Sequence, residues 1–370
     1  MLRFKGSQQF RQRLAFSTLS GRPIRIDDIR TRDASPGLRD YEASLLRLLE
    51  KLTNGCVVEI NETGTSLRYR PGVIICGAGL SHECPASRSI GYFLEPLVLL
   101  ALFAKKPLSI TLRGVTNDSL DPSVDVFRTV TLPLLRRAAG IDDALELRIA
   151  RRGARPGGGG EVALRAPAVK ALPAVAMVEE GMVKRVRGIA YSMKVSPQNA
   201  NRMVDGARGV LNALLADVYV FTDSASGAAG GASPGYGAVL VAETTSGALI
   251  SAEACATQGE PESLRAPGDD PLVVPEDVGR AAAQLLLDEV SRGGVVDGAH
   301  QGLLLTLAAL GPEEICSLRL GPLTPHAVRT LRHLREFFGV VFDVKTDAAS
   351  ATVILSCVGC GLKNLSRKIT

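Results

Sequence analysis

Aromatic side chains are scarce in this sequence, and long apolar runs are missing. Aromatic residues make up 4% of the 370 residues, and tryptophan is absent. Proteins that bind single-stranded nucleic acid by base stacking present several aromatic rings, so the composition disfavours such a platform. The best apolar run, Leu97–Ala104, is far shorter than the roughly 20 residues that span a bilayer. We therefore expect no membrane-spanning segment and no membrane partner.

Disulfide frameworks and zinc motifs are also missing. The seven cysteines include one close pair, Cys357 and Cys360, without a second pair or a nearby histidine. This pattern predicts reduced, buried thiols in an intracellular protein and no metal site. The net charge of +5 is modest. Arginine makes up most of the basic residues, which fits bidentate phosphate contacts and equally a GC-rich coding sequence.

What is present is a repeated order of elements: a helix, a strand, an amphipathic helix, a glycine and two strands. The first set is a helix before strand 24–29, helix 40–52 with Gly55, and strands 57–60 and 67–70. The second set is helix 96–104, strand 108–112, helix 122–139 with Gly140, and strands 145–150 and 161–165. The third set is helix 300–310, strand 315–320, helix 325–338 with Gly339, and strands 340–344 and 351–355. The glycines are expected to be left-handed C-caps.

More than a hundred residues separate the second set from the third. They predict a helix from Ser196-Pro197 to about residue 215, strands 218–222, 238–242 and 251–256, a loop at 258–275, and a helix at 276–291. The predicted fold class is α/β: three tandem repeats, each with two helices on a small sheet, form a large domain that receives a smaller α+β insertion. The predicted boundaries are 1–187 for repeats one and two, 188–275 for the insertion and 276–370 for repeat three.

The sharpest local feature is the segment Arg152–Val162, which contains four consecutive glycines before a strand. Glycines let backbone amides approach another group closely, and clustered amides favour anions. We expect this role rather than packing, although a flexible hairpin loop would explain the same composition. The predicted phosphate, RNA or partner contacts here are Arg152, Arg155, Gly157, Gly158 and Gly159.

The same segment reads Arg-Gly, two residues, Pro, one residue, three Gly, one residue and an aliphatic residue. This order resembles the signature of the RNA 3′-terminal phosphate cyclase family. The resemblance extends over nearly the whole chain through 6–8, 20–24, 36–38 and 70–72. Segments 5–11, 91–96, 196–203 and 364–369 resemble the cyclase-like branch of eukaryotes, which works in ribosome assembly. The three-repeat domain with an insertion is also the architecture that the resemblance implies.

The resemblance places the nucleotide site at the N-terminal loop and the last helix. Active cyclases carry an acidic Glu-Gly-Gly-Gly-Gln run where this chain has Gly6–Phe10, and an Asp-Gln pair where it has His300-Gln301. Because Mg²⁺ prefers hard oxygen ligands, losing both carboxylates argues against catalysis, and we expect no cofactor. His326 falls at the place of the adenylylated histidine, behind an expected N-cap at Thr324. It is a vestigial candidate nucleophile, or a structural or RNA-facing side chain.

The last helix also has a basic side. Helical spacing predicts a core face of Val328, Leu331, Leu334 and Phe338. Arg329 then points away from the core, flanked by Arg332 and His333. This face predicts contact with an RNA backbone or an acidic partner segment, or is simply a solvated basic face.

The function implied by the resemblance is a factor of the nucleus and nucleolus for 18S rRNA maturation. It would act as a scaffold in the small-subunit processome, with a nucleolar GTPase, pre-rRNA and the snoRNP assembly as partners. An active ATP-dependent cyclase that uses His326 is the main alternative. A pre-rRNA endonuclease would need clustered carboxylates, and a small-molecule α/β transferase is the third alternative.

Overall fold

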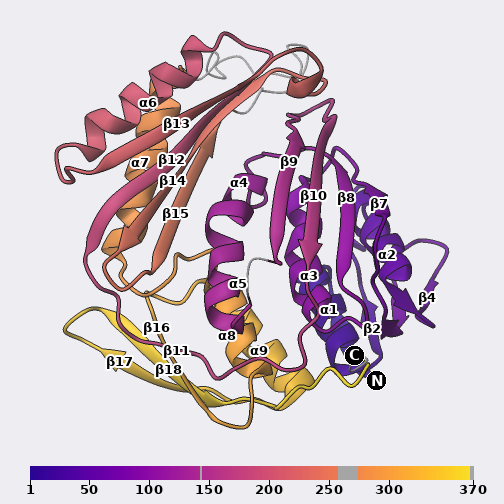
Figure 1. Cartoon of the computed structure of the whole chain (residues 1–370). Helices are drawn as coiled ribbons and strands as arrows, with labels where there is room; N and C mark the ends of the chain where they lie inside the picture. The colour runs from indigo at the N-terminus through magenta and orange to yellow at the C-terminus, as the bar shows by residue number, and fades with distance from the viewer. Residues whose placement is uncertain (142–143, 257–273, 367–370) are drawn as a thin grey trace.

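The computed structural model describes residues 1–141, 144–256 and 274–366 (Figure 1). The described part is a mixed α/β fold, as the sequence predicts, and contains four four-stranded sheets. None of its helices is long and apolar enough to cross a membrane. The predicted loop at 258–275 lies outside the described residues, except for Val274 and Pro275 at its end.

The first sheet has the order β1-β2-β5-β4. Its strands are β1 (Leu2–Lys5), β2 (Ile24–Asp27), β5 (Leu67–Arg70) and β4 (Val57–Ile60). β1 pairs with β2 in parallel, and the other pairs are antiparallel. In β1, β2 and β5 alternate side chains face the core, as the two-residue period of a half-covered sheet requires. Helices α1 (Phe10–Ser20) and α2 (Asp40–Leu52) contribute to the same apolar core, so the opposite face of the sheet is left to solvent.

Two further sheets have the same order of one parallel and two antiparallel pairs. One contains β7 (Leu80–Glu83), β8 (Leu108–Gly114), β10 (Gly160–Ala166) and β9 (Glu146–Arg151). The other contains β11 (Ala176–Met177), β16 (Ile315–Leu320), β18 (Thr352–Val358) and β17 (Asp343–Asp347). Their helices are α3 (Ile90–Leu102), α4 (Val124–Val126) continued through a π turn (127–131) into α5 (Leu132–Ala139), α8 (Gln301–Leu310) and α9 (Pro325–Phe338). A small pair, β3 (Thr53–Asn54) and β6 (Val73–Ile74), lies after α2.

The fourth sheet has the order β13-β12-β14-β15. Its strands are β12 (Val183–Met193), β13 (Val218–Ala225), β14 (Gly235–Thr244) and β15 (Leu249–Cys255), and its helices are α6 (Gln198–Leu211) and α7 (Pro275–Ser291). Both helices lie on one face of this sheet, and α4 lies on the other (Figure 1). The sequence assigns α7 to the large domain, yet α7 packs closely on α6. At Gly206 and Gly279 an added Cβ would lie within 2.3 Å of the other helix's backbone.

Several predicted boundaries differ from the structure. Gly140 and Gly339 end their helices in the left-handed conformation as expected, with φ of 59° and 74°. Gly55 does not, because α2 ends earlier and Thr53 continues in extended conformation into β3. The strand expected at 340–344 begins only at Asp343, since Val340 is buried against the core. The domain boundaries at 187 and 275 stay predictions.

Candidate functional site

A cavity of about 250 Å³ lies between the loop before α1 and the start of α9. The side chains most relevant to its chemistry are Gln9, Arg11, Arg30, Arg88, His326 and Arg329. Arg13 donates to the carbonyl of Gly6 at 2.8 Å and so holds the loop that precedes the helix. Gln9 adopts φ 54°, a left-handed conformation that non-glycine residues rarely adopt. The cavity is therefore walled by a constrained loop and a helix N-terminus.

His326 is bound by the side chain of Gln9. Thr324 is the N-cap of α9, as predicted, because its hydroxyl accepts the amide of Ala327 at 3.1 Å. The Gln9 amide nitrogen lies 3.1 Å from His326 Nδ1 and also donates to the His326 carbonyl at 3.2 Å. Since a carbonyl only accepts, this nitrogen is the donor and Nδ1 is the acceptor. Burial lowers the pKa of His326, against an opposing effect of Glu95. The ring is thus neutral at pH 7, with its proton on Nε2 and the Nδ1 lone pair in use.

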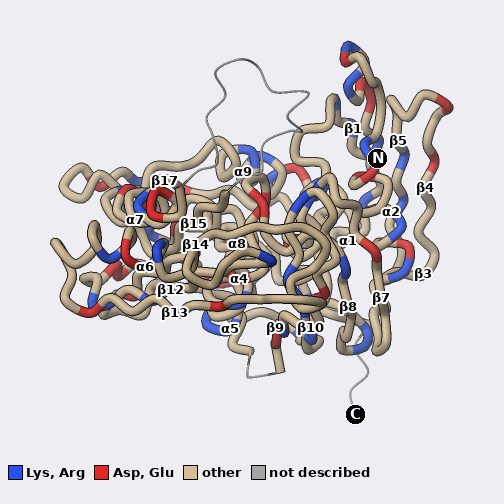
Figure 2. Tube along the Cα trace, turned by 90° about the horizontal axis from the view of Figure 1, so that it is seen from above, with Lys and Arg blue, Asp and Glu red and all other residues tan. Residues whose placement is uncertain are grey.

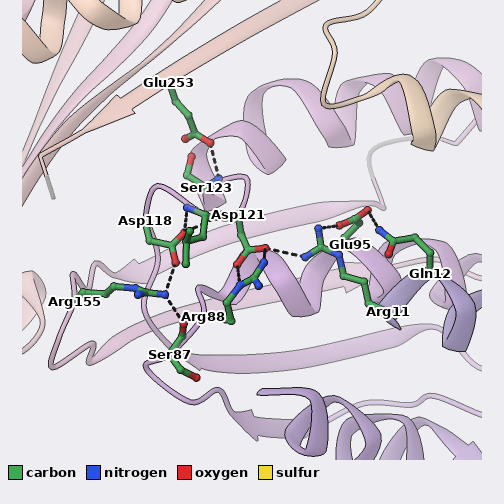
Figure 3. Close-up of polar contacts among 11 residues, drawn as sticks. Arg11, Gln12, Ser87, Arg88, Glu95, Asp118, Asp121, Ser123, Arg155 and Glu253 are labelled. Atoms are coloured by element: carbon green, nitrogen blue, oxygen red, sulfur yellow. Dashed lines mark hydrogen bonds and ion pairs between the residues drawn. The ribbon is translucent and has the colours of Figure 1, made fainter. Parts of the chain in front are cut away.

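Most arginines around this cavity are already paired with carboxylates (Figure 3). Arg11 lies 2.8 Å from Asp121 and also pairs with Glu95, while Arg88 donates to Asp121 at 2.6 Å. Burial opposes ionisation of Asp121, but the hydrogen bonds and charges of Arg88 and Arg11 hold its pKa below the usual value. Such pairs fix side chains more than they attract ligands, because their charges cancel locally.

Two further arginines of the cavity differ from each other. Arg30 is held by Glu42, with both guanidinium nitrogens at 2.7 Å from the carboxylate. The side chain of Arg329 forms no hydrogen bond or ion pair within the described part of the chain and is exposed. The free positive charge at the cavity mouth is therefore on α9.

The glycine segment packs against a second loop, so the expectation that its glycines do not serve packing is wrong. Gly157 donates its amide to the Ser233 hydroxyl at 2.9 Å, and Gly158 accepts the amide of Ala232 at 2.9 Å. An added Cβ on Gly157 would lie 2.7 Å from Ala232. Gly158 and Gly159 have φ of 63° and 80°, which suits glycine. The close approach predicted from the sequence is thus made to residues 231–233 of the chain itself.

The two arginines beside this loop have different environments. The Arg152 side chain is 3% exposed and lies 2.6 Å from Asp125 of α4 and 2.8 Å from Asp223 of β13. It was expected on the surface, and the structure corrects this. The Arg155 side chain is 37% exposed, lies 3.0 Å from Asp118 and donates to the carbonyl of Ser87 (Figure 3). Of the two, only Arg155 is open to an external phosphate.

The outward face of α9 is narrower than predicted. Arg329 and Arg332 are exposed, in agreement with the helical spacing. His333 is 7% exposed and packs edge-on against Phe4, with ring centroids 5.4 Å apart. Its expected outward orientation is wrong, because α9 turns Ala327, Thr330, Leu334 and Phe337 inward, and His333 lies on that side.

Comparison with known proteins identifies the family of this site. The family model for RNA 3′-terminal phosphate cyclase matches residues 2–344. The chain belongs to the RNA 3′-terminal phosphate cyclase family. It is similar to a probable RNA 3′-terminal phosphate cyclase-like protein of Arabidopsis thaliana, 51% identical over 100% of this chain and 99% of that protein. The RNA 3′-terminal phosphate cyclase-like protein of Homo sapiens is 49% identical, over 100% of this chain and 98% of its own. An rRNA processing protein of Schizosaccharomyces pombe is 46% identical, over 99% of this chain and 98% of that protein.

His300 and Gln301 are built into the packing and hydrogen bonding of the fold. His300 is 4% exposed, with Nδ1 2.7 Å from Asp297 and Nε2 2.9 Å from the Thr131 hydroxyl. Gln301 accepts the amide of Thr324 at 2.9 Å and so positions the start of α9. Neither side chain is among those lining the cavity beside His326.

Sequence reasoning missed the carboxylates that organise the site. Asp121, Asp125 and Glu95 pair with arginines up to 110 residues away. No local spacing signals such long-range pairs.

Proposed function

We propose that this protein is a ribosome-biogenesis factor of the nucleus and nucleolus, required for 18S rRNA maturation in the small-subunit processome. The main support is similarity along the full chain to cyclase-like proteins and to a protein named for rRNA processing. We further infer that the three sheets of identical order are tandem repeats, with the sheet of β12–β15 as an insertion.

The protein acts in this proposal as a scaffold that does not adenylylate itself. The observation that carries this part is the contact between Gln9 and His326. A nucleophilic imidazole needs a free lone pair aimed at the phosphorus, and here Nδ1 is occupied while Nε2 carries the proton. Three of the cavity's arginines, Arg11, Arg88 and Arg30, are paired with Asp121, Glu95 and Glu42, which leaves Arg329 as the unpaired arginine among those that line it in the described part of the chain.

The N-terminal position of His326 favours the second candidate function, an active ATP-dependent cyclase. The start of a helix attracts phosphate through its free amides and dipole. A covalent nucleotide on His326 is the specific product that separates this candidate from the scaffold.

The contact surface of the scaffold is the exposed face of α9. Arg329 and Arg332, which are exposed like Arg335 of the same helix, need no rearrangement to meet a polyanion. The occupant we propose is pre-rRNA of the snoRNP assembly or an acidic segment of a nucleolar GTPase. Arg155 provides a second contact, separate from the arginines of α9.

The test is charge reversal on α9 in cells depleted of the native protein. An Arg329→Glu/Arg332→Glu variant should accumulate 18S rRNA precursors, measured by northern blotting. The matched control is Arg280→Glu/Arg292→Glu, which changes the same charge on two exposed arginines around α7. Normal 18S production by the α9 variant would leave this helix as a solvated basic face.

A further inference from the structure

The outer face of the first sheet carries more positive charge than its own carboxylates neutralise. Five outward side chains on its strands are basic: Arg3, Lys5, Arg25, Arg68 and Arg70. Two outward side chains, Asp27 and Glu59, are acidic. The five basic residues lie on β1, β2 and β5, and Figure 2 shows Lys and Arg along β5. Three positive charges are thus concentrated on one sheet face of a chain whose total is +5.

Three of these arginines form a row across the strands. Arg3 lies opposite Arg25, and Arg25 lies opposite Arg68 in the strand register. Neighbouring strands are about 4.8 Å apart, so the row spans roughly 10 Å. Like charges directly opposite each other destabilise a sheet. The fold therefore keeps a row that costs stability.

The row is only partly neutralised. Arg25 donates to both oxygens of Asp27 at 2.9 and 3.0 Å, and Arg68 donates to Glu59 at 3.0 Å. Arg25 and Arg68 nevertheless stay 47% and 48% exposed. The side chains of Arg3 and Arg70 form no hydrogen bond or ion pair within the described residues. These side chains can reach an external anion without breaking the core.

We propose that this sheet face, defined by Arg3, Arg25, Arg68 and Arg70, binds the phosphate backbone of double-stranded RNA. Guanidinium groups match phosphates bidentately and are weakly hydrated. Rigid strands present them as a flat array, which suits a duplex surface better than a flexible strand. The exposed aromatic side chains of the described chain, Tyr219 and Phe221, lie on β13, away from this face. Contact through the backbone, without base stacking, follows. The inference goes beyond the proposed function, which uses α9, and depends on it only for the source of the RNA.

The experiment compares two triple variants with the same change in charge. Arg3→Gln/Arg25→Gln/Arg68→Gln removes the row. The control, Arg208→Gln/Arg280→Gln/Arg292→Gln, removes three exposed arginines around α6 and α7. Two of its three are ion-paired, to Asp277 and Glu289, as are two of the three in the row. Binding to a mixed-sequence RNA duplex of about 20 base pairs would be followed by fluorescence anisotropy across a salt series.

We expect the row variant to reduce the slope of log affinity against log salt by about 2–3, since each lost phosphate contact removes roughly 0.9. The control should keep the wild-type slope. The proposal would be overturned if the row variant kept the affinity and slope of the wild type, or if the control lost as much slope as the row variant. So would competition by a poly-glutamate peptide as effective as competition by RNA. If the triple variant melts early, the single change Arg3→Gln, which breaks no pair, should still reduce the slope by about 1.

Discussion

Replacing Arg152 should destabilise the protein far more than its place beside a glycine loop suggests. The Asp125 side chain is 0% exposed, and Arg152 contacts both of its oxygens at 2.6 and 2.9 Å. Although burial favours the neutral acid, Arg152 holds the pKa of Asp125 below its usual value. Removing one partner of a buried pair costs about 3–5 kcal/mol. Asp125 would keep its contacts with Asn117 at 3.1 Å and Arg128 at 3.3 Å. The loss in free energy of unfolding should therefore be about 3 kcal/mol, at the lower end of this range.

The assay is thermal unfolding of Arg152→Met by calorimetry. With about 2.1 cal/mol/K of unfolding entropy per residue, a loss of about 3 kcal/mol lowers Tm by about 4 °C if the chain unfolds as one unit. Arg155→Met, which breaks a more exposed pair, should cost less than about 1 kcal/mol. Adding Asp125→Asn to Arg152→Met should recover part of the lost stability, because the unpaired negative charge of the buried Asp125 carboxylate is then removed. A Tm for Arg152→Met within about 1 °C of wild type would refute the reasoning.

Two further predictions concern nucleotide chemistry and pH. Purified protein incubated with labelled ATP and Mg²⁺ should show no covalent adduct on a denaturing gel, and a band that disappears in His326→Ala would contradict this. Burial, with the nearby charges of Asp125 and Asp118, raises the pKa of Glu253 to about 7. An acid whose pKa is raised on folding contributes stability at low pH that is lost as the pH rises through about 7. The free energy of unfolding of Glu253→Gln, measured with denaturant, should therefore exceed that of wild type by up to about 3 kcal/mol at pH 8 and by little at pH 5. The same difference between variant and wild type at both pH values would refute this prediction.

Local patterns predicted the elements well, and tertiary contacts account for what they missed. The helix at 40–52 and the strands at 57–60 and 67–70 have the predicted bounds because their apolar periods are regular. The C-cap of this helix was wrongly assigned to Gly55, because Thr53 caps the helix in extended conformation and pairs in β3. Arg152 and His333 were placed on the surface because their partners, Asp125, Asp223 and Phe4, are distant in sequence.

The candidate site was found through the family motif more than through its chemistry. The position of His326 behind the Thr324 N-cap is readable from the sequence. Its contact with Gln9 is not, since 317 residues separate the two. Likewise, the arginine row on the first sheet depends on strand register, which alternation alone does not provide.

The central claim, a role in 18S rRNA maturation that does not use the histidine as a nucleophile, can be tested in cells depleted of the native protein. His326→Ala would be expressed at the native level, and mature 18S rRNA and its precursors would be measured against a wild-type copy and an empty vector. The account predicts that the empty vector accumulates 18S precursors and that His326→Ala restores normal 18S rRNA. Failure of a folded, stably expressed His326→Ala protein to restore 18S rRNA would contradict it.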